Sequence, residues 1–398
     1  MSRPVVDHTN SGQQSVNVIY LDNNATTATD PRVCKAVADA MARGPANASS
    51  QHQLGMSARH QLDQSLAVIG EVLGSDLTRV DAARLIVTSG GTEANNLALN
   101  GIGDPAAPIV VSRIEHPSVL ALAESMERSG RLVGWLDVDS HGVVRLDSLA
   151  ELFANLPTLP ALVSVMSANN ETGVIQPIAD IAAACHQAGV PLHVDATQSV
   201  GKVEINLSSL GADAVTITPH KLHGPAGIGF LWLRSGLEIR PSLRGGEQQL
   251  LTRPGTEPVA MVAGAAEAVR LAVGELSKSA EHMNRLRDRF ECGLLDRLGE
   301  QAIVIHGRQV SRLPSTTCVS FLGHDRQQLL MSLDLAGIAC SSGSACSSGS
   351  SPPSHVLMAM GCHRDEVQSV IRFGVSKFST AVEIDHSLDR ICRLILGR

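Results

Sequence analysis

Short runs of β-branched and aliphatic residues alternate with Ala- and Leu-rich stretches from about residue 20 to residue 235. The apolar runs predict strands at Leu85–Thr88, Ile109–Ser112, Leu162–Met166, Pro191–Val194, Ala214–Thr218 and Gly229–Leu233. Between and before them, apolar residues at helical spacing predict helices at Pro31–Arg43, Ser57–Leu73, Thr92–Asn100, Pro117–Ser129 and Ile178–Ala188. Strands that alternate with helices are typical of a mainly parallel sheet covered by helices, so we expect an α/β fold.

The pattern changes in the last third of the chain. Pro258–Ala280 is a long stretch with apolar residues at helical spacing, and it predicts a helix that leads into a second domain. Beyond it the sequence predicts another helix, weaker strands near 302–306 and 315–322, a helix at 325–336 and a final pair of helices. We therefore expect an irregular N-terminal arm (1–18) that packs with the smaller domain, a large domain (19–265) and a smaller C-terminal domain (266–398).

Composition narrows the class of protein. The chain has 398 residues, of which 43% are hydrophobic, and this is ample for two cores. A net charge of −7 without any basic run argues against nucleic acid as a partner. No apolar stretch is long enough to span a membrane, and the N-terminus lacks a signal-peptide pattern. The eight cysteines are scattered and include no Cys-x-x-Cys pair, so we expect a cytoplasmic protein with no structural disulfides and no metal site.

Two residues suggest the chemistry. Lys221 ends an apolar run in Val-Thr-Ile-Thr-Pro-His-Lys (215–221), and Asp195 ends another in Val-Pro-Leu-His-Val-Asp (190–195). A partly buried lysine is a good nucleophile for Schiff-base formation because desolvation lowers the pKa of its amine. A carboxylate can in turn hold a pyridinium nitrogen. Together they are the minimal protein contribution to a pyridoxal phosphate (PLP) site.

Further polar residues follow the other predicted strands, where open α/β sheets bind ligands. Gly91 and Thr92 open a predicted helix after a Gly turn, which would suit a phosphate group, although a simple helix cap is about as common. His116 follows the second of these strands, and such a histidine is more often structural. The remaining candidates at strand ends are Asn170, Gln198, Thr218 and His220.

Seven segments together resemble one enzyme family. They are Tyr20–Thr27, Ser89–Asn96, Glu115–Val119, Asn169–Gly173, His193–Gly201, His220–Pro225 and Ser342–Cys346. In content, order and spacing they are similar to the cysteine desulfurases of the NifS/IscS type, group I. The resemblance implies the PLP fold type I, with a mainly parallel seven-stranded sheet in the large domain, and a homodimer. It also implies an enzyme that takes sulfur from L-cysteine, leaves L-alanine and passes the sulfur to an acceptor protein.

The resemblance also implies roles for single residues. Lys221 would form the Schiff base and move the Cα proton, Asp195 would pair with the pyridinium nitrogen, and His116 would stack on the ring and shuttle protons. Gln198 would bind the ring oxygen. Gly91, Thr92, Thr218 and His220 would hold the phosphate, joined by Thr256 from the neighbouring subunit. Arg372 would bind the substrate carboxylate with help from Asn170.

Cys346 would accept the sulfur as a persulfide. It stands in a Ser- and Gly-rich stretch, 341–354, which offers little to pack and would otherwise be interpreted as a linker. Cys340, shortly before it, is expected to be structural. An aminotransferase of class V or a selenocysteine lyase would share Lys221 and Asp195, but an aminotransferase would not need Cys346. A scaffold without activity would be expected to have lost Lys221, Asp195 or Arg372, and a dinucleotide-binding dehydrogenase would need a Gly-x-Gly-x-x-Gly motif after its first strand.

Overall fold

The computed structural model describes residues 18–45, 47–79, 81–342 and 352–397. Its largest element is a seven-stranded sheet with the strand order β2-β8-β7-β6-β5-β3-β4. The strands are β2 (Arg84–Thr88), β3 (Ile109–Ser112), β4 (Val133–Leu136), β5 (Leu162–Met166), β6 (Leu192–Asp195), β7 (Ala214–Ile217) and β8 (Gly229–Leu233). All neighbours pair in parallel except β8, which is antiparallel to both β2 and β7. The predicted α/β fold with a mainly parallel seven-stranded sheet is confirmed.

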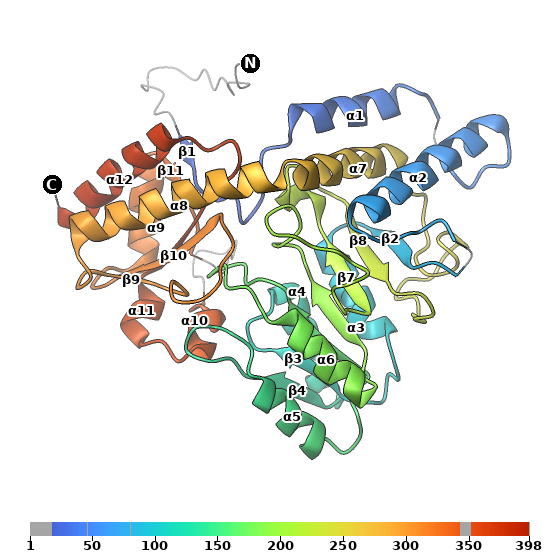
Figure 1. Cartoon of the computed structure of the whole chain (residues 1–398), viewed down its shortest axis with the longest axis horizontal. Coiled ribbons are helices and arrows are strands. Elements are labelled where there is room, and N and C mark those ends of the chain that lie inside the picture. The colour runs from blue at the N-terminus through green and yellow to red at the C-terminus, as the bar shows by residue number, and fades with distance from the viewer. Residues whose placement is uncertain (1–17, 46, 80, 343–351, 398) are drawn as a thin grey trace.

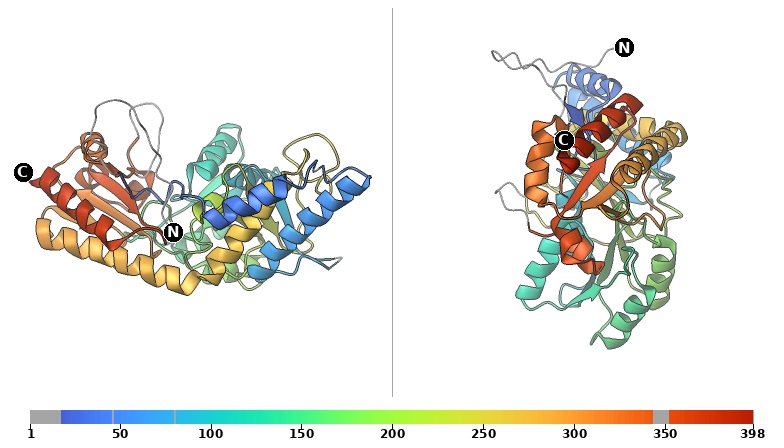
Figure 2. Two further views of the ribbon diagram at one scale, coloured as in Figure 1. Left: turned by 90° about the horizontal axis from the view of Figure 1, so that it is seen from above. Right: turned by 90° about the vertical axis from the view of Figure 1, so that its left-hand side faces the viewer.

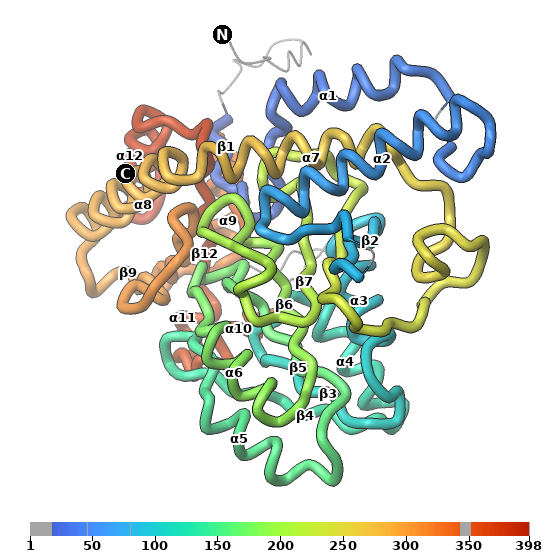
Figure 3. The backbone as a smooth tube through the Cα atoms, turned by 45° about the vertical axis from the view of Figure 1, so that its right-hand side comes forward, coloured from blue at the N-terminus to red at the C-terminus, as the bar shows by residue number. Residues whose placement is uncertain are grey.

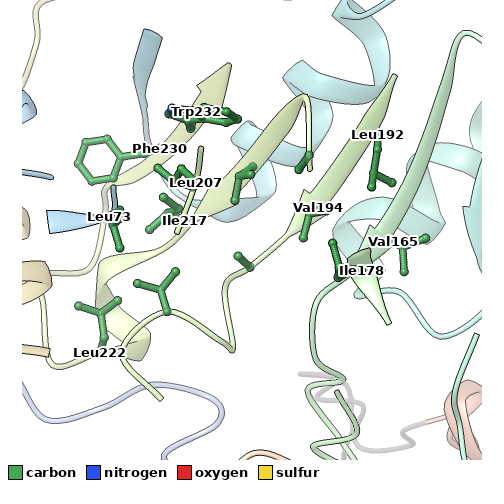
Figure 4. Close-up of a cluster of buried hydrophobic side chains, with 14 of the residues drawn as sticks. Leu73, Val165, Ile178, Leu192, Val194, Leu207, Ile217, Leu222, Phe230 and Trp232 are labelled. Atoms are coloured by element: carbon green, nitrogen blue, oxygen red, sulfur yellow. The ribbon is translucent and has the colours of Figure 1, made fainter. Parts of the chain in front are cut away.

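Helices cover both faces of this sheet (Figure 1). One face packs with α1 (Pro31–Met41), α2 (Gln53–Val72), α5 (Leu146–Asn155), α6 (Ile178–Ala188) and α7 (Val259–Gly274), and the other with α3 (Gly91–Gly101) and α4 (Pro117–Arg128). The central strands are buried along their whole length, as expected where helices lie on both sides. Figure 4 shows part of the first core, where Val165, Val194 and Ile217 from three neighbouring strands pack with Phe230 and Trp232.

The second part of the chain forms a smaller sheet, β12-β10-β9, with its own hydrophobic core. Its elements are α8 (Leu276–Leu298), β9 (Ile303–Ile305), β10 (Thr316–Phe321), α9 (Arg326–Leu335), β11 (Ile338–Ala339), α10 (His355–Ala359), α11 (Arg364–Gln368), β12 (Val370–Gly374) and α12 (Ala381–Leu396). Helices α8 and α12 lie side by side on this part of the molecule (Figure 2). The short strand β1 (Ile19–Tyr20) pairs with β11, so the start of the described chain lies against the second core.

The helix expected at Pro258–Ala280 is two helices. Helix α7 ends at Gly274, and α8 begins at Leu276 and continues to Leu298, well beyond the predicted end. Glu275 stands between them with φ −101° and ψ 4°, and its carboxylate is held by Arg32 and Lys377. This break lets the two helices pass from the large sheet to the small one (Figures 1 and 2).

The domain boundaries that we expected at 18/19 and 265/266 remain a proposal. The arm before residue 18 lies outside the described residues. Within the described part of the chain no helix has both the length and the apolar character needed to cross a membrane.

Candidate active site

The candidate residues lie where the parallel strands end. His116 follows β3, Asn170 follows β5, Asp195 is the last residue of β6, and Lys221 closes the one-turn 3-10 helix Pro219–Lys221 after β7. Because parallel neighbours point the same way, their carboxyl ends meet at one edge of the sheet. The structure therefore brings together groups that are more than a hundred residues apart in sequence.

Lys221 extends its amine toward the segment before α1. Its Nζ donates to the backbone oxygen of Asn24 at 2.6 Å and also to that of Ala25. Burial lowers the pKa of Lys221 to about 8, and the positive charge of Arg372 acts in the same direction. An appreciable fraction of this amine is therefore neutral near physiological pH, as a nucleophilic lysine requires.

Asp195 is buried, and both of its carboxylate oxygens have partners. Oδ2 accepts a hydrogen bond from Asn95 Nδ2 at 2.9 Å, and Oδ1 accepts from the Thr197 backbone N–H at 2.9 Å. Asn95, which lies on α3, also donates to Ser118 Oγ at the start of α4. The carboxylate is thus held in one orientation from two sides.

The N-terminus of α3 lies beside the end of β7. Gly90 is the N-cap and no side chain caps the helix, so the first N–H groups are available to a ligand. A Cβ atom on Gly91 would lie 2.7 Å from Thr218 Oγ1, and Thr218 Oγ1 lies 3.1 Å from Thr197 Oγ1. The space beside Thr218 is open because Gly91 has no side chain. Backbone N–H groups and hydroxyl groups surround this space, and together they can bind an anion.

His116 is the N-cap of α4. Its Nδ1 accepts the Ser118 backbone N–H at 3.1 Å and lies 2.8 Å from Ser118 Oγ, so the proton of the neutral ring is on Nε2. Desolvation by the surrounding protein lowers the pKa of His116, and Asp195 opposes this shift. Although the surrounding protein partly desolvates it, His116 remains accessible to solvent, so its Nε2–H can reach a ligand.

Gln198 connects Lys221 with a second buried lysine. Its Nε2 donates to the Asn24 backbone oxygen at 3.0 Å, the same oxygen that Lys221 Nζ approaches, while its Oε1 accepts from Lys202 Nζ at 2.8 Å. Burial lowers the pKa of Lys202 to about 7. Since an amide nitrogen has two hydrogens, Gln198 keeps one donor for a ligand.

Arg372 lies in the middle of β12 and is buried. Its Nη2 is 2.9 Å from Asp22 Oδ1, and its Nη1 donates to the Asn170 backbone oxygen at 3.0 Å. Two further buried atoms, Arg372 Nε and Asn170 Oδ1, have no hydrogen-bond partner among the described residues. Unpaired buried polar atoms are costly, so this pair of atoms points to a ligand with both donor and acceptor groups.

The two described ends of the Ser- and Gly-rich stretch are attached close to Arg372. Ser341 and Arg372 exchange two backbone hydrogen bonds, of 2.6 Å and 3.3 Å, and Ser341 Oγ donates to Asp22 Oδ1 at 3.0 Å. At the other end, Ser354 Oγ donates to Glu171 Oε2 at 2.6 Å, next to Asn170. Cys346 itself lies outside the described residues.

His220 and Thr256 are the other two residues that were predicted to bind the phosphate. His220 Nδ1 lies 3.1 Å from Thr26 Oγ1, and burial together with the charges of Lys221 and Lys202 lowers its pKa to about 4. Thr256 is exposed in the segment between β8 and α7, which lies at the edge of the molecule (Figure 3). Arg253 ties this segment to the first turn of α3 through Glu93, with distances of 2.7 Å and 3.1 Å.

Comparison with known proteins gives the family. The profile described as aminotransferase class-V matches residues 19–386. The chain is 39% identical over 381 residues to the cysteine desulfurase of Nostoc sp., with 94% of this chain and 92% of the relative covered. It is 34% identical to the cysteine desulfurase IscS of Dictyoglomus turgidum, with 95% and 94% covered. The solved NifS-like protein from Rickettsia africae superposes with a TM-score of 0.87 at 32% identity, over 96% of this chain and all of that one (100%).

The chain belongs to the aminotransferase class-V family. The relatives confirm the resemblance to NifS- and IscS-type proteins that the motifs indicated, and the fold is that of PLP enzymes of type I. Pyridoxal phosphate is the cofactor of this family. The residues of this chain fit it: the cradle between α3 and Thr218 suits the phosphate, the fixed carboxylate of Asp195 suits a ring nitrogen, and Lys221 offers its amine.

Three residues that support the site have no distinctive pattern of their own in the sequence. Asn24 donates through Nδ2 to the Asn170 backbone oxygen at 3.2 Å. Its own backbone oxygen accepts hydrogen bonds from Lys221 Nζ and Gln198 Nε2. Asp22 and Asn95 hold Arg372 and Asp195, respectively. Asn24, Asp22 and Asn95 all stand in segments that carried the family resemblance, and that was the only signal in the sequence that could have found them.

Proposed function

We propose that this protein is a cysteine desulfurase. It takes L-cysteine, transfers the substrate sulfur to the thiol of Cys346, and releases L-alanine. In the balanced reaction the thiol sulfur of the substrate becomes the outer sulfur of a Cys346 persulfide, and the hydrogens of both thiols are shared between alanine and the persulfide. No external oxidant or reductant is needed.

The observation that carries the proposal is the attachment of both ends of the Cys346 segment beside Arg372. Ser341 is paired with Arg372, and Ser354 is bonded to Glu171 next to Asn170. Cys346 is five residues from Ser341, so its backbone can lie at most about 17 Å away, at roughly 3.4 Å per residue. The Cys346 thiol must reach a substrate bound at Arg372 and then carry the sulfur to an acceptor outside the site. A segment attached at both ends beside Arg372 allows both.

Arg372 and Asn170 would bind the substrate. The guanidinium of Arg372 is suited to the carboxylate of an amino acid because it donates from several N–H groups in one plane. Its Nε is free of a partner in the described structure, whereas Nη2 is shared with Asp22. Asn170 Oδ1, also without a partner there, would complete the contact.

Gly91, Thr92, Thr218 and His220 would hold the phosphate of PLP, Gln198 the ring oxygen, and Asp195 the ring nitrogen. Bound in this way, PLP supplies an electron sink for bonds broken at the substrate.

Lys221 would attach the cofactor and, as an amine whose pKa is about 8, take and return the proton at the substrate Cα. His116 would hold a proton at Nε2 for the substrate thiol. The thiolate of Cys346 attacks the substrate sulfur, the Cβ–Sγ bond breaks, and its electron pair stays on the carbon skeleton, which is protonated to alanine.

The assembly and partners belong to the same proposal. The enzyme would act as a homodimer in which Thr256, exposed in one chain, reaches the phosphate of the other. The persulfide would pass to a sulfur-acceptor protein for iron–sulfur cluster or thio-cofactor assembly. We place this activity in the cytoplasm, where a reducing environment keeps thiols free, and the seven cysteines of the described chain are unpaired.

The test is to supply L-cysteine and measure L-alanine from the wild type, from Cys346→Ala and from Cys340→Ala. Wild type and Cys340→Ala should form alanine, because burial raises the pKa of the Cys340 thiol and makes it a poor nucleophile. Cys346→Ala should form almost none. Alanine release by Cys346→Ala at the wild-type rate would instead favour a lyase or aminotransferase of the same fold.

A further inference from the structure

Three side chains that bind metals elsewhere in proteins gather outside the candidate active site. His306 follows β9, Cys362 lies in the turn between α10 and α11, and Glu366 lies in α11. One ligand atom of each is within 4.8 Å of the others, and this is the one such group found among the described residues. These elements belong to the smaller part of the molecule, around the β12-β10-β9 sheet (Figure 1).

The hydrogen bonds of His306 fix which ring nitrogen is free. Ser320 Oγ donates its only proton to the Glu366 backbone oxygen at 2.7 Å, so it must accept at its 2.7 Å contact with His306 Nε2. Nε2 therefore carries the ring proton. The lone pair of Nδ1 then faces Cys362 Sγ, which is 3.8 Å away. An imidazole whose second nitrogen donates to a fixed oxygen is the usual arrangement of a metal-binding histidine.

A carboxylate is the third potential ligand, beside the thiol of Cys362. One oxygen of Glu366 lies within 4.8 Å of both Cys362 Sγ and a ring nitrogen of His306. A divalent cation in place of the thiol proton would contact the sulfur, the nitrogen and the oxygen together.

The spacing also suits a metal. Zinc–sulfur and zinc–nitrogen bonds of about 2.3 Å and 2.0 Å, at a tetrahedral angle, put sulfur and nitrogen about 3.5 Å apart. The observed separation of 3.8 Å therefore needs little movement. The backbone holds both sides of the cluster, because His306 N donates to Cys318 O at 2.9 Å and Cys362 N donates to Leu357 O at 3.0 Å.

We propose that His306, Cys362 and Glu366 form a binding site for a single zinc ion. His306 is buried while Cys362 and Glu366 are partly exposed, so the fourth position opens to solvent and would be taken by water. On binding, the S–H bond of Cys362 breaks, a Zn–S bond forms and the proton leaves to solvent. The ion would join β9 to the turn that follows α10, the helix that begins directly after Ser354.

The test uses the PLP-bound protein carrying Cys346→Ala, so that the proposed acceptor thiol cannot bind the metal. Equilibrium dialysis against zinc buffered by a chelator should give one zinc per chain. In that background Cys362→Ser and His306→Gln should each weaken binding at least about 100-fold, and Ser320→Ala about 10- to 100-fold because it frees the ring. Cys34→Ser, which changes an exposed cysteine elsewhere, should leave binding unchanged.

Crystals equilibrated with zinc should show anomalous density among His306, Cys362 and Glu366. Zinc should also raise the thermal unfolding temperature, and Cys362→Ser should abolish that rise. Binding that is equal in the parent protein and in both ligand variants would overturn the proposal. So would zinc density found only at other positions.

Discussion

The backbone of Ser341 is paired with the backbone of Arg372 through hydrogen bonds of 2.6 Å and 3.3 Å. The side chains of the same two residues meet at one acceptor, Asp22 Oδ1, at 3.0 Å and 2.9 Å. The residue proposed to bind the substrate carboxylate is thus joined to the start of the segment proposed to supply the thiol. Any change at Asp22 should affect both.

Asp22→Asn should lower both KM and kcat, for two different reasons. A neutral amide competes less for Arg372, so KM for L-cysteine should fall a few-fold, whereas the weaker hold on Ser341 should lower kcat about tenfold. Ser341→Ala removes only the hydroxyl contact, and it should lower kcat while KM stays unchanged. Steady-state alanine formation measures both, with thermal unfolding as a check that each variant is folded. A wild-type KM in Asp22→Asn, or a wild-type kcat in Ser341→Ala, would argue against this coupling.

Arg372→Lys should raise KM for L-cysteine about 10- to 100-fold, because a hydrogen bond to a charged group contributes about 1.5–3 kcal/mol and lysine cannot donate as a planar fork. The effect on kcat should be smaller. Arg289→Lys is a suitable control, since Arg289 pairs with Asp385 on the exposed surface. If both variants had wild-type KM values, Arg372 would not bind the substrate carboxylate.

The pKa of Lys221 should govern how fast PLP attaches to the cofactor-free protein. Only the neutral amine reacts, and burial lowers the pKa of Lys221 to about 8 from its ordinary value of 10.5. The attachment rate should rise about tenfold per pH unit below pH 8 and level off above it. The growth of a visible absorption band that borohydride removes measures this rate.

Arg372 is the second cause of that shift, after burial. Arg372→Met should therefore move the midpoint of the attachment rate to higher pH. Lys221→Ala should bind PLP without the visible band. A wild-type rate that kept rising to pH 10 would contradict the lowered pKa.

Gly91→Ala should weaken PLP binding by at least about tenfold, because the added Cβ would lie 2.7 Å from Thr218 Oγ1 and close the cradle. Thr218→Ser keeps the hydroxyl group and removes only a methyl group, so it should bind PLP nearly as the wild type does. Fluorescence titration of the cofactor-free proteins with PLP compares the three. Equal affinity in Gly91→Ala would mean that the phosphate lies elsewhere.

The strands that carry the site could be predicted closely from the sequence. The bounds of β3, β5 and β8 agree with the predicted ones, because a strand buried on both faces is a continuous apolar run with polar residues at its end. Strand β4 was not predicted, since it lies at the sheet edge, alternates between buried and partly buried residues and contains Gly134. Strand β12 was also missed, because Arg372 interrupts its apolar pattern.

The supporting contacts could not be predicted in the same way. Asn24 and Asn170 are 146 positions apart, and Asp22 and Arg372 are 350 apart, so no local pattern links them. Lys202 stands close to Gln198 in sequence, yet only the turn that the chain makes at these residues brings the two side chains into hydrogen-bonding contact. The roles assigned to single residues, including Cys346 and Thr256, remain predictions that the experiments above test.

The most direct test of the account is to locate the sulfur after one turnover. The PLP-bound wild type is incubated with L-cysteine, its thiols are alkylated, and its peptides are analysed by mass spectrometry. We expect one additional sulfur atom on Cys346, none on Cys340 or Cys362, and strongly reduced labelling in Arg372→Lys at low substrate concentration. Alanine formed without added sulfur on Cys346, or with sulfur on another cysteine, would contradict it.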